Sequence, residues 1–484
     1  MTNNSDVPNP LLERLPVFND IQEVAYQLRY LPLKNTNVKT LSVMKRIELL
    51  VCEAAPFEPT VQAVRIACTL VGMLYGSYES RNPVVIKNRQ DLLVLLAAGA
   101  RGLEKIPKIS HGQVSAQVIQ GVTGVGKTVL LKRLCSLIPQ AIVRGPNKET
   151  GWQQCVQITY LHVPMSHDGS RGGLLHGIFS EIDSLLGTRH AIDVPKKYTG
   201  IEKQVVQVCA LLHTHYVGLL IIDELQSRNI VTSVQSDKMQ LFLLSIMNSG
   251  IPLVLVGNPL GFTWIDDFSQ DLRRLYNLPP EVIHPVGAIN EVGEKDWNAI
   301  FKGVSSYYVL NDPVKNISHL KKKLLKLSGG IPDLAFSIWR AAQRNVLQSG
   351  KNLMSSDDLQ AAYDSRGFDK LRPLAEGFYN KDPIILSRYE DSNWHYYADT
   401  WGIKINQDDI QPNKPLLINA VGTKKKRTPK KRVSEQSKLK AKITREKNKD
   451  AARKKLTQEL SEDDIRSAGI QQYLLDSLEG LSKI

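Results

Sequence analysis

The chain has 484 residues, more than one hydrophobic core usually holds, so its length predicts two or three domains. Its hydrophobic content of 42% is ordinary for a globular protein, and no apolar run reaches the roughly 20 residues of a membrane span. The five cysteines are widely spaced without a C-x-x-C pair, which indicates reduced thiols rather than a disulfide framework or a zinc site. Because residues 1–10 also lack the features of a signal peptide, we expect a cytoplasmic protein with no membrane partner.

The formal net charge of +14 is concentrated near the carboxyl end of the chain. Sixteen Lys or Arg residues and three acidic residues lie between Lys424 and Lys455. Such a segment attracts a phosphate backbone independently of sequence and in a salt-sensitive manner. An acidic protein partner and solubility alone are the alternatives. We favour a basic tail over residues 424–460 that binds double-stranded DNA.

Helical spacing of apolar residues predicts a helical N-terminal domain over residues 1–90, with helices over 47–55 and 61–75 that are separated by Pro56 and Pro59. From residue 91 to 290, strand and helix patterns alternate, which predicts right-handed crossovers and a parallel sheet. The expected strands are 114–119, 156–163, 219–222, 253–256 and 282–286.

Within this region, residues 121–128 fit the phosphate-binding pattern G-x-x-x-x-G-K-[ST]. A strand pattern over 113–120 precedes the glycines and a helical pattern over 128–138 follows them, so backbone N–H groups and the helix dipole face the phosphates. Lys127 is expected to reach the β- and γ-phosphates, and Thr128 to ligate Mg²⁺. The predicted ATP-binding residues are Gly121, Val122, Thr123, Gly124, Val125, Gly126, Lys127, Thr128 and Val129.

An apolar run over 218–222 ends in Asp223 and Glu224. Its uninterrupted apolar character favours a central strand that is covered on both faces. At the end of such a strand, Asp223 can hold the water shell of Mg²⁺ and Glu224 can deprotonate the attacking water. The alternative is a strand that merely ends in a solvated acidic pair.

Helical patterns follow over 294–302, 318–327, 332–347 and 356–364, with Ser356 and Asp357 as candidate caps, and predict a helical lid over residues 291–366. A connector over 367–423 contains an aromatic cluster, Trp394 to Tyr397 with Trp401, for which packing against the core is favoured over base stacking. Residues 461–484 begin with a capping-box pattern and continue as an amphipathic stretch that could dock into another protein.

The order of these motifs resembles the AAA+ ATPases, whose α/β P-loop NTPase fold joins a parallel sheet to a C-terminal helical lid. The resemblance makes Asn258, after the strand 253–256, the polar residue that contacts the γ-phosphate or the lytic water. It makes Arg273 or Arg274 the arginine finger that acts on a neighbouring subunit's nucleotide, although an Arg pair that caps a helix C-terminus is the alternative. The family's lid arginine has no match after Gly-Gly-Ile-Pro332, because the nearest basic residue is Arg340, which favours a switch-like ATPase over fast turnover.

Asp223-Glu-Leu-Gln226, Val256-Gly-Asn-Pro259 and Leu327-Ser-Gly-Gly-Ile-Pro332 together resemble the TnsC/TniB family of transposition regulators. The resemblance implies ATP-dependent assembly on duplex DNA as a homo-oligomeric ring or filament, and disassembly on hydrolysis. It also implies that the chain links a target selector (TnsD/TniQ-like) to transposase subunits (TnsA/TnsB-like). Candidate DNA-contacting residues are Arg171, Lys196, Lys197, Arg228 and Lys238. A replication initiator or helicase loader, and a signalling P-loop switch without DNA, remain the alternatives.

Overall fold

The computed structural model describes residues 7–52, 55–108, 114–226, 233–265, 273–289, 293–389 and 391–405. The predicted basic tail (424–460) and docking segment (461–484) lie outside the described residues. Among the described residues, no helix combines the length and apolar character needed to cross a membrane.

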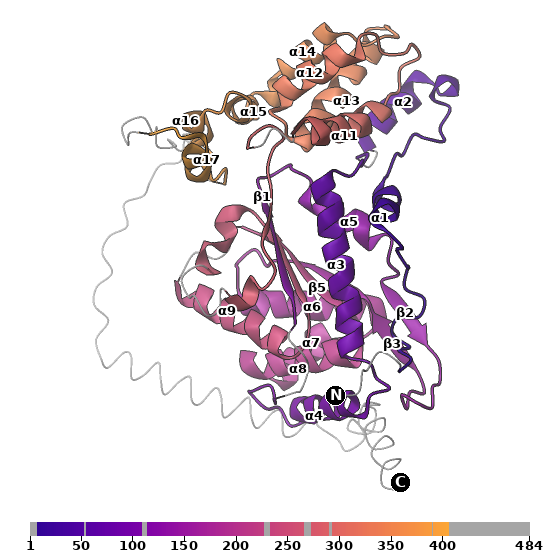
Figure 1. Cartoon of the computed structure of the whole chain (residues 1–484), viewed down its shortest axis with the longest axis vertical. Helices are drawn as coiled ribbons and strands as arrows, with labels where there is room; N and C mark the ends of the chain where they lie inside the picture. The colour runs from indigo at the N-terminus through magenta and orange to yellow at the C-terminus, as the bar shows by residue number, and fades with distance from the viewer. Residues whose placement is uncertain are drawn as a thin grey trace, which may run out of the picture. The chain divides into compact units, whose positions relative to one another are not determined.

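The fold contains a parallel five-stranded sheet in the order β4-β5-β6-β1-β7. Figure 1 labels two of its strands, β1 and β5. Its strands are β1 Ala116–Gly121, β4 Tyr160–Pro164, β5 Leu219–Leu225, β6 Leu253–Gly257 and β7 Glu281–Ile283. The strand that precedes the phosphate loop therefore lies beside the strand that ends at Asn258, which in turn lies beside the strand that carries Asp223. The α/β P-loop fold predicted from the sequence is confirmed.

Alternate residues of the central strands belong to two different hydrophobic cores. On β5, Leu220 and Ile222 face one core, which helices α6 (Arg171–Leu186), α8 (Ile201–Thr214) and α9 (Ser233–Asn248) complete. Leu219 and Ile221 face the other core, completed by α3 (Val61–Ser80) and α5 (Lys127–Cys135). Both faces are covered, which explains why β5 is an uninterrupted apolar run.

The predicted strand 156–163 is wrong as a single element, because the structure divides it at Thr159. Its first half, β3 (Cys155–Ile158), pairs antiparallel with an unpredicted strand, β2 (Ala141–Arg144), and only β4 joins the central sheet. The Thr159 hydroxyl donates to the carbonyl of Pro139 at 2.6 Å and its N–H donates to Gln140 O at 2.9 Å. These long-range bonds redirect the chain from one sheet to the other. Hydrophobic periodicity depends only on neighbouring residues, so it cannot predict them.

Segments before residue 91 pack into two different parts of the fold. Helices α1 (Ile21–Leu28) and α3 contribute to the core that contains α5, whereas Leu50 of α2 (Val43–Cys52) belongs to the core of the lid. The hydroxyl of Tyr307 in the lid donates to Leu49 O at 2.7 Å. Two further helices are α4 (Ile86–Ala100) and α7 (His190–Lys197). The domain boundaries expected from the sequence stay predictions.

The four helices expected after the sheet are present as α11 Gly293–Ser306, α12 Ile317–Ser328, α13 Pro332–Gln348 and α14 Ser356–Tyr363. The predicted caps of α14 are wrong by one residue, because Ser355 is the N-cap and forms a reciprocal capping box with Asp358. Ser356 and Asp357 occupy the first helical turn instead.

Three helices of the connector follow the lid: α15 Arg372–Tyr379, α16 Pro383–Leu386 and α17 Trp394–Trp401 (Figure 1). The indole N–H of Trp401 donates to Ala288 O at 2.6 Å, and His284 Nδ1 lies 3.0 Å from the hydroxyl of Tyr397. The aromatic cluster thus packs on the segment that links the sheet to the lid, which confirms the packing interpretation.

Candidate nucleotide-binding site

The phosphate loop joins the end of β1 to the start of α5. Gly126, the residue before α5, has φ of 98°, a left-handed conformation that a side chain would strain. Lys127 begins the helix, and its Nζ donates to Gly121 O at 2.7 Å and to Val122 O at 3.0 Å. Burial lowers the pKa of Lys127 to about 8, against the opposing influence of the nearby carboxylates Asp223 and Asp391. A desolvated ammonium of this kind gains strongly from a bound phosphate.

Asp223 is buried at the end of β5, where three donors hold its carboxylate. Its Oδ2 accepts from the Thr128 hydroxyl at 3.0 Å and lies 3.2 Å from His162 Nε2, while its Oδ1 accepts from the Glu224 N–H at 2.7 Å. Burial alone would raise the pKa of Asp223, but these hydrogen bonds outweigh it and lower the pKa. Two adjoining oxygen ligands, one hydroxyl and one carboxylate, fit the preference of Mg²⁺.

Glu224 lies at an irregularity of the sheet, between the paired residues Ile222 and Leu225. Its φ of 61° is left-handed, and its side chain is exposed in the same pocket as Asp223. A non-glycine residue in this conformation costs on the order of 1–3 kcal/mol, and such strain gathers at functional sites. The irregularity interrupts the regular pairing of β5, and Glu224 is the one exposed residue of a strand that is otherwise buried.

Asn258 follows β6 and is buried beside the lysine of the phosphate loop. Its Oδ1 lies 3.5 Å from Lys127 Nζ, and its N–H donates to Leu225 O at 3.0 Å. A Cβ at Gly257 would come within 2.1 Å of that same carbonyl, so only glycine allows β6 to approach the end of β5 here. Asn258 thus lines the same pocket as Asp223 and Glu224.

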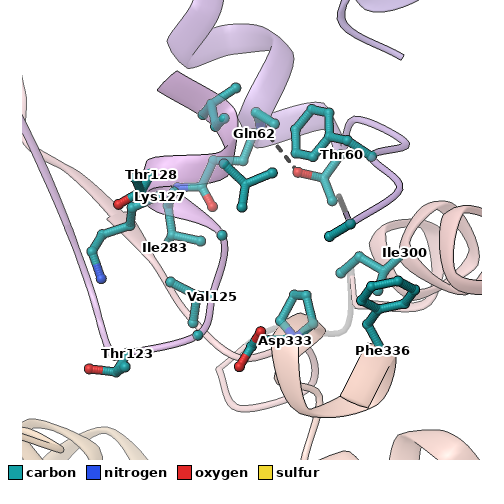
Figure 2. A pocket seen from close by; sticks show the side chains of 18 of the residues that line it. Thr60, Gln62, Thr123, Val125, Lys127, Thr128, Ile283, Ile300, Asp333 and Phe336 are labelled. Atoms are coloured by element: carbon teal, nitrogen blue, oxygen red, sulfur yellow. Dashed lines mark hydrogen bonds between the residues drawn. The ribbon is translucent and has the colours of Figure 1, made fainter. Parts of the chain in front are cut away.

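These residues line one pocket of about 400 Å³ that also includes N-terminal and lid residues (Figure 2). The N–H of Asp333, at the start of α13, donates to Gly124 O at 3.1 Å and so attaches the lid to the phosphate loop. Asp333 stands where the family resemblance expects the lid arginine. Arg340 lies further along α13, and its guanidinium packs 4.6 Å from the ring centroid of Phe336.

A carboxylate from the connector also reaches the phosphate loop. Asp391 Oδ2 accepts from the Thr123 hydroxyl at 3.1 Å and lies 3.5 Å from Asn258 Nδ2. The contact spans 268 residues of sequence. It connects the segment before α17 to both the phosphate loop and the end of β6.

The remaining candidate residues lie away from this pocket. Arg273 and Arg274 are exposed and immediately precede the buried Leu275, while Lys196 and Lys197 are exposed at the end of α7. Lys238 is exposed on α9, and Arg228 lies outside the described residues. Arg171 Nη1 pairs with Glu202 Oε1 at 2.7 Å, which engages its charge within the chain.

Sequence reasoning missed three residues of the site: His162, Asp333 and Asp391. His162 occupies the strand beside β5, but a lone histidine in an apolar strand gives no signal of which carboxylate it meets. Asp333 acts through its backbone, and Asp391 belongs to a segment without a recognisable motif. In the described part of the chain, no group of three or more His, Cys, Asp or Glu residues is arranged to hold a metal ion.

None of the curated proteins compared with the chain matches its sequence. Solved structures that resemble it include ORC2 of Aeropyrum pernix with ADPNP and ADP, at 13% identity and a TM-score of 0.40 over 75% of this chain and 81% of that chain. Drosophila ORC bound to DNA has 11% identity and a TM-score of 0.38 over 76% of this chain and 82% of that chain. The RuvB Holliday junction branch migration motor of Thermotoga maritima has 16% identity and a TM-score of 0.30 over 66% of this chain and 81% of that chain. At these TM-scores the similarities carry no argument about function.

The family model described as "AAA domain" matches residues 113–263, which span the phosphate loop, the acidic pair and Asn258. Residues 113–263 are therefore similar to an AAA domain, and the strand order β4-β5-β6-β1-β7 agrees with the AAA+ P-loop fold.

Proposed function

We propose that the chain is an ATPase that assembles on duplex DNA and regulates DNA transposition. The observation that carries the ATPase part is the convergence of Lys127, Thr128, Asp223, Glu224 and Asn258 on one pocket. Asp223 and Glu224 belong to β5, Asn258 follows the neighbouring strand β6, and Lys127 and Thr128 begin α5.

In this proposal Lys127 binds the terminal phosphates, and Thr128 and Asp223 hold Mg²⁺, which neutralises phosphate charge when it is bound. Glu224 accepts the proton of the attacking water, and Asn258 orients that water or the γ-phosphate. Arg273 or Arg274 of one protomer reaches the nucleotide of the next, so that hydrolysis depends on assembly. The exposure of both arginines supports this role.

Binding to DNA and the role in transposition rest on other features. The basic tail supports attraction to a phosphate backbone, with exposed Lys196, Lys197 and Lys238 as further candidates. The resemblance to TnsC/TniB proteins supports cytoplasmic homo-oligomers that connect a TnsD/TniQ-like selector to TnsA/TnsB-like transposase subunits. By the same resemblance, ATP hydrolysis disassembles the oligomer.

Phosphate release by the full chain, measured with and without linear duplex DNA, tests the ATPase and the DNA partner together. The Glu224→Gln variant should retain ATP binding and lose hydrolysis by roughly 100-fold or more, because the base for the attacking water is gone. Lys127→Ala should lose ATP binding itself. A Glu224→Gln variant that hydrolyses ATP at the normal rate would contradict the assignment of the base.

Electron microscopy of the Glu224→Gln variant with ATP and linear DNA should show decorated DNA that is absent with ADP. In the organism that encodes the chain, the Lys127→Ala variant should abolish insertion of a marked mobile element without slowing growth. Slower growth with normal insertion would favour a replication initiator. Bare DNA in every nucleotide state, with no stimulation of hydrolysis, would favour a signalling switch.

A further inference from the structure

We propose that Gln62 makes the pocket selective for adenine, a 6-amino purine, over guanine, a 6-oxo purine. This inference rests on the ATP site proposed above and assigns its base specificity to one side chain. Gln62 belongs to the first turn of α3, far from the phosphate-binding motifs in sequence but in the same pocket (Figure 2).

Part of the pocket lining is apolar and suits a flat purine ring. Figure 2 labels Ile283 of β7 with Ile300 and Phe336 of the lid, and Phe57 and Val304 line the same pocket. Apolar walls provide affinity for a base, while a few fixed polar groups provide its orientation and specificity. The question is therefore which polar atoms the wall leaves available.

The orientation of the Gln62 amide is fixed by two acceptors. Its Nε2 donates to Val282 O at 2.9 Å and to Glu281 Oε2 at 3.2 Å. Arg65 in turn holds the carboxylate of Glu281: its Nε donates to Oε1 at 2.9 Å and its Nη2 donates to Oε2 at 2.6 Å. Rotating the amide by half a turn would place the Gln62 carbonyl against a carbonyl and a carboxylate, so the observed orientation is the stable one.

Both Nε2 hydrogens are used in these bonds, so Gln62 presents only its carbonyl oxygen, Oε1, to a ligand. Among the described residues Oε1 has no hydrogen-bond partner, and it is not sealed from solvent. Two other polar residues line the same pocket. Thr60 Oγ1 accepts from the Ala63 N–H at 3.2 Å and keeps its hydroxyl proton as a donor, while Glu58 Oε1 pairs with Arg29 and Lys302 and its Oε2 is sealed from solvent.

A fixed acceptor recognises a donor, and the purines differ in this respect at position 6. The amino group of adenine donates a hydrogen bond to Oε1, whereas the oxo group of guanine would meet Oε1 as a second acceptor. A site that presents one unpaired polar group discriminates by the hydrogen bond gained with one ligand and by the desolvation left uncompensated with the other.

Equilibrium binding of ATP, GTP and purine riboside triphosphate to the full chain tests this inference. The third ligand carries hydrogen in place of the 6-amino group. The wild-type protein should prefer ATP to each of the other two by roughly 10- to 100-fold. Gln62→Leu, which keeps the size and removes the acceptor, should reduce both preferences to about onefold, because it removes the hydrogen bond to ATP and the uncompensated desolvation with the other two ligands. Gln348→Leu makes the same change at an exposed position of α13 and should leave both preferences unchanged.

The comparison of ATP with purine riboside triphosphate uses the unaltered protein, so the inference stays testable even if Gln62→Leu does not fold. Equal wild-type affinities for ATP and GTP, or a Gln62→Leu variant that keeps the wild-type preference, would overturn the role of Gln62 and leave the ATP site intact. If the wild-type chain binds none of the three triphosphates, the proposed ATP site itself fails.

Discussion

At the scale of residues, the polar groups of the candidate site hold one another by hydrogen bonds. Asp223 is bound by Thr128, by His162 and by the N–H of Glu224, so its carboxylate is already oriented. Preorganisation of this kind reduces the free energy that binding must spend on ordering side chains. Asp391 differs, because it adds negative charge where the phosphates are expected.

Replacing Asp391 by Asn should strengthen ATP binding by roughly two- to tenfold, because the carboxylate beside Thr123 repels the triphosphate. ADP carries less charge, so its affinity should rise less. The comparison uses equilibrium binding at low ionic strength, where electrostatic effects are least screened. Asp399→Asn removes the same charge from an exposed position of α17 and serves as the control. Weaker ATP binding by Asp391→Asn would show that this carboxylate assists the nucleotide instead.

At the scale of elements, the short segment after β7 links the sheet, the lid and the connector. The N–H of Val286 in this segment donates to Gly330 O of the lid at 2.9 Å, and α17 packs on His284 and Ala288 of the same segment. A movement of the lid on nucleotide binding would therefore displace α17 as well.

Packing of α17 on His284 should make the stability of the chain sensitive to acid. Burial lowers the pKa of His284 to about 4 from its ordinary 6.5, so the folded state keeps the ring neutral. Between those values the unfolded chain binds the extra proton, and stability therefore falls as the pH drops from about 6.5 to about 4, by up to about 3 kcal/mol.

Thermal unfolding midpoints across this range should fall less steeply for His284→Gln than for the wild type, because glutamine has no charge to acquire. The exposed His319→Gln variant should follow the wild-type curve. Identical pH dependence of His284→Gln and the wild type would show that His284 does not control acid stability.

At the scale of the whole molecule, the proposed catalysis needs two copies of the chain. In the Arg273→Ala, Arg274→Ala double variant the nucleotide pocket is intact but the finger is missing, whereas Lys127→Ala has the finger and no functional pocket. Each variant alone should hydrolyse little ATP. A mixture should recover part of the wild-type rate, measured as phosphate release, because the finger of one copy completes the pocket of the other. A mixture no faster than the separate variants would place the finger within one chain or exclude both arginines.

The basic tail should dominate the salt dependence of DNA binding. Truncation after residue 423 removes the basic tail and the docking segment, and with them eighteen Lys or Arg residues and nine acidic residues. The truncated chain should keep its ATP affinity and bind duplex DNA more weakly, with a shallower dependence of log affinity on log salt concentration. A DNA affinity and salt slope equal to those of the full chain would assign DNA binding to the described body, where Lys196 and Lys197 are the first candidates.

The sequence by itself determined the contiguous parts of the site. Phosphate recognition uses neighbouring backbone N–H groups and side chains, so Gly121 to Val129 could be identified from their order, and the apolar run before Asp223 indicated a strand that is covered on both faces. Asn258 was identified through the resemblance to the AAA+ ATPases, and its place in the site agrees with parallel strands that end at one edge of the sheet.

Only the tertiary structure decided which distant residues join these parts. His162, Gln62 and Asp391 lie on three separate segments, and their contacts depend on strand order, on the packing of α3 against β7 and on the path of the connector. Thr159 divides one predicted strand for the same reason, because its partners lie about 20 residues away in sequence. Local periodicity shows which side chains of a segment are buried. Long-range hydrogen bonds depend on which segments the whole fold brings together, so periodicity does not predict them.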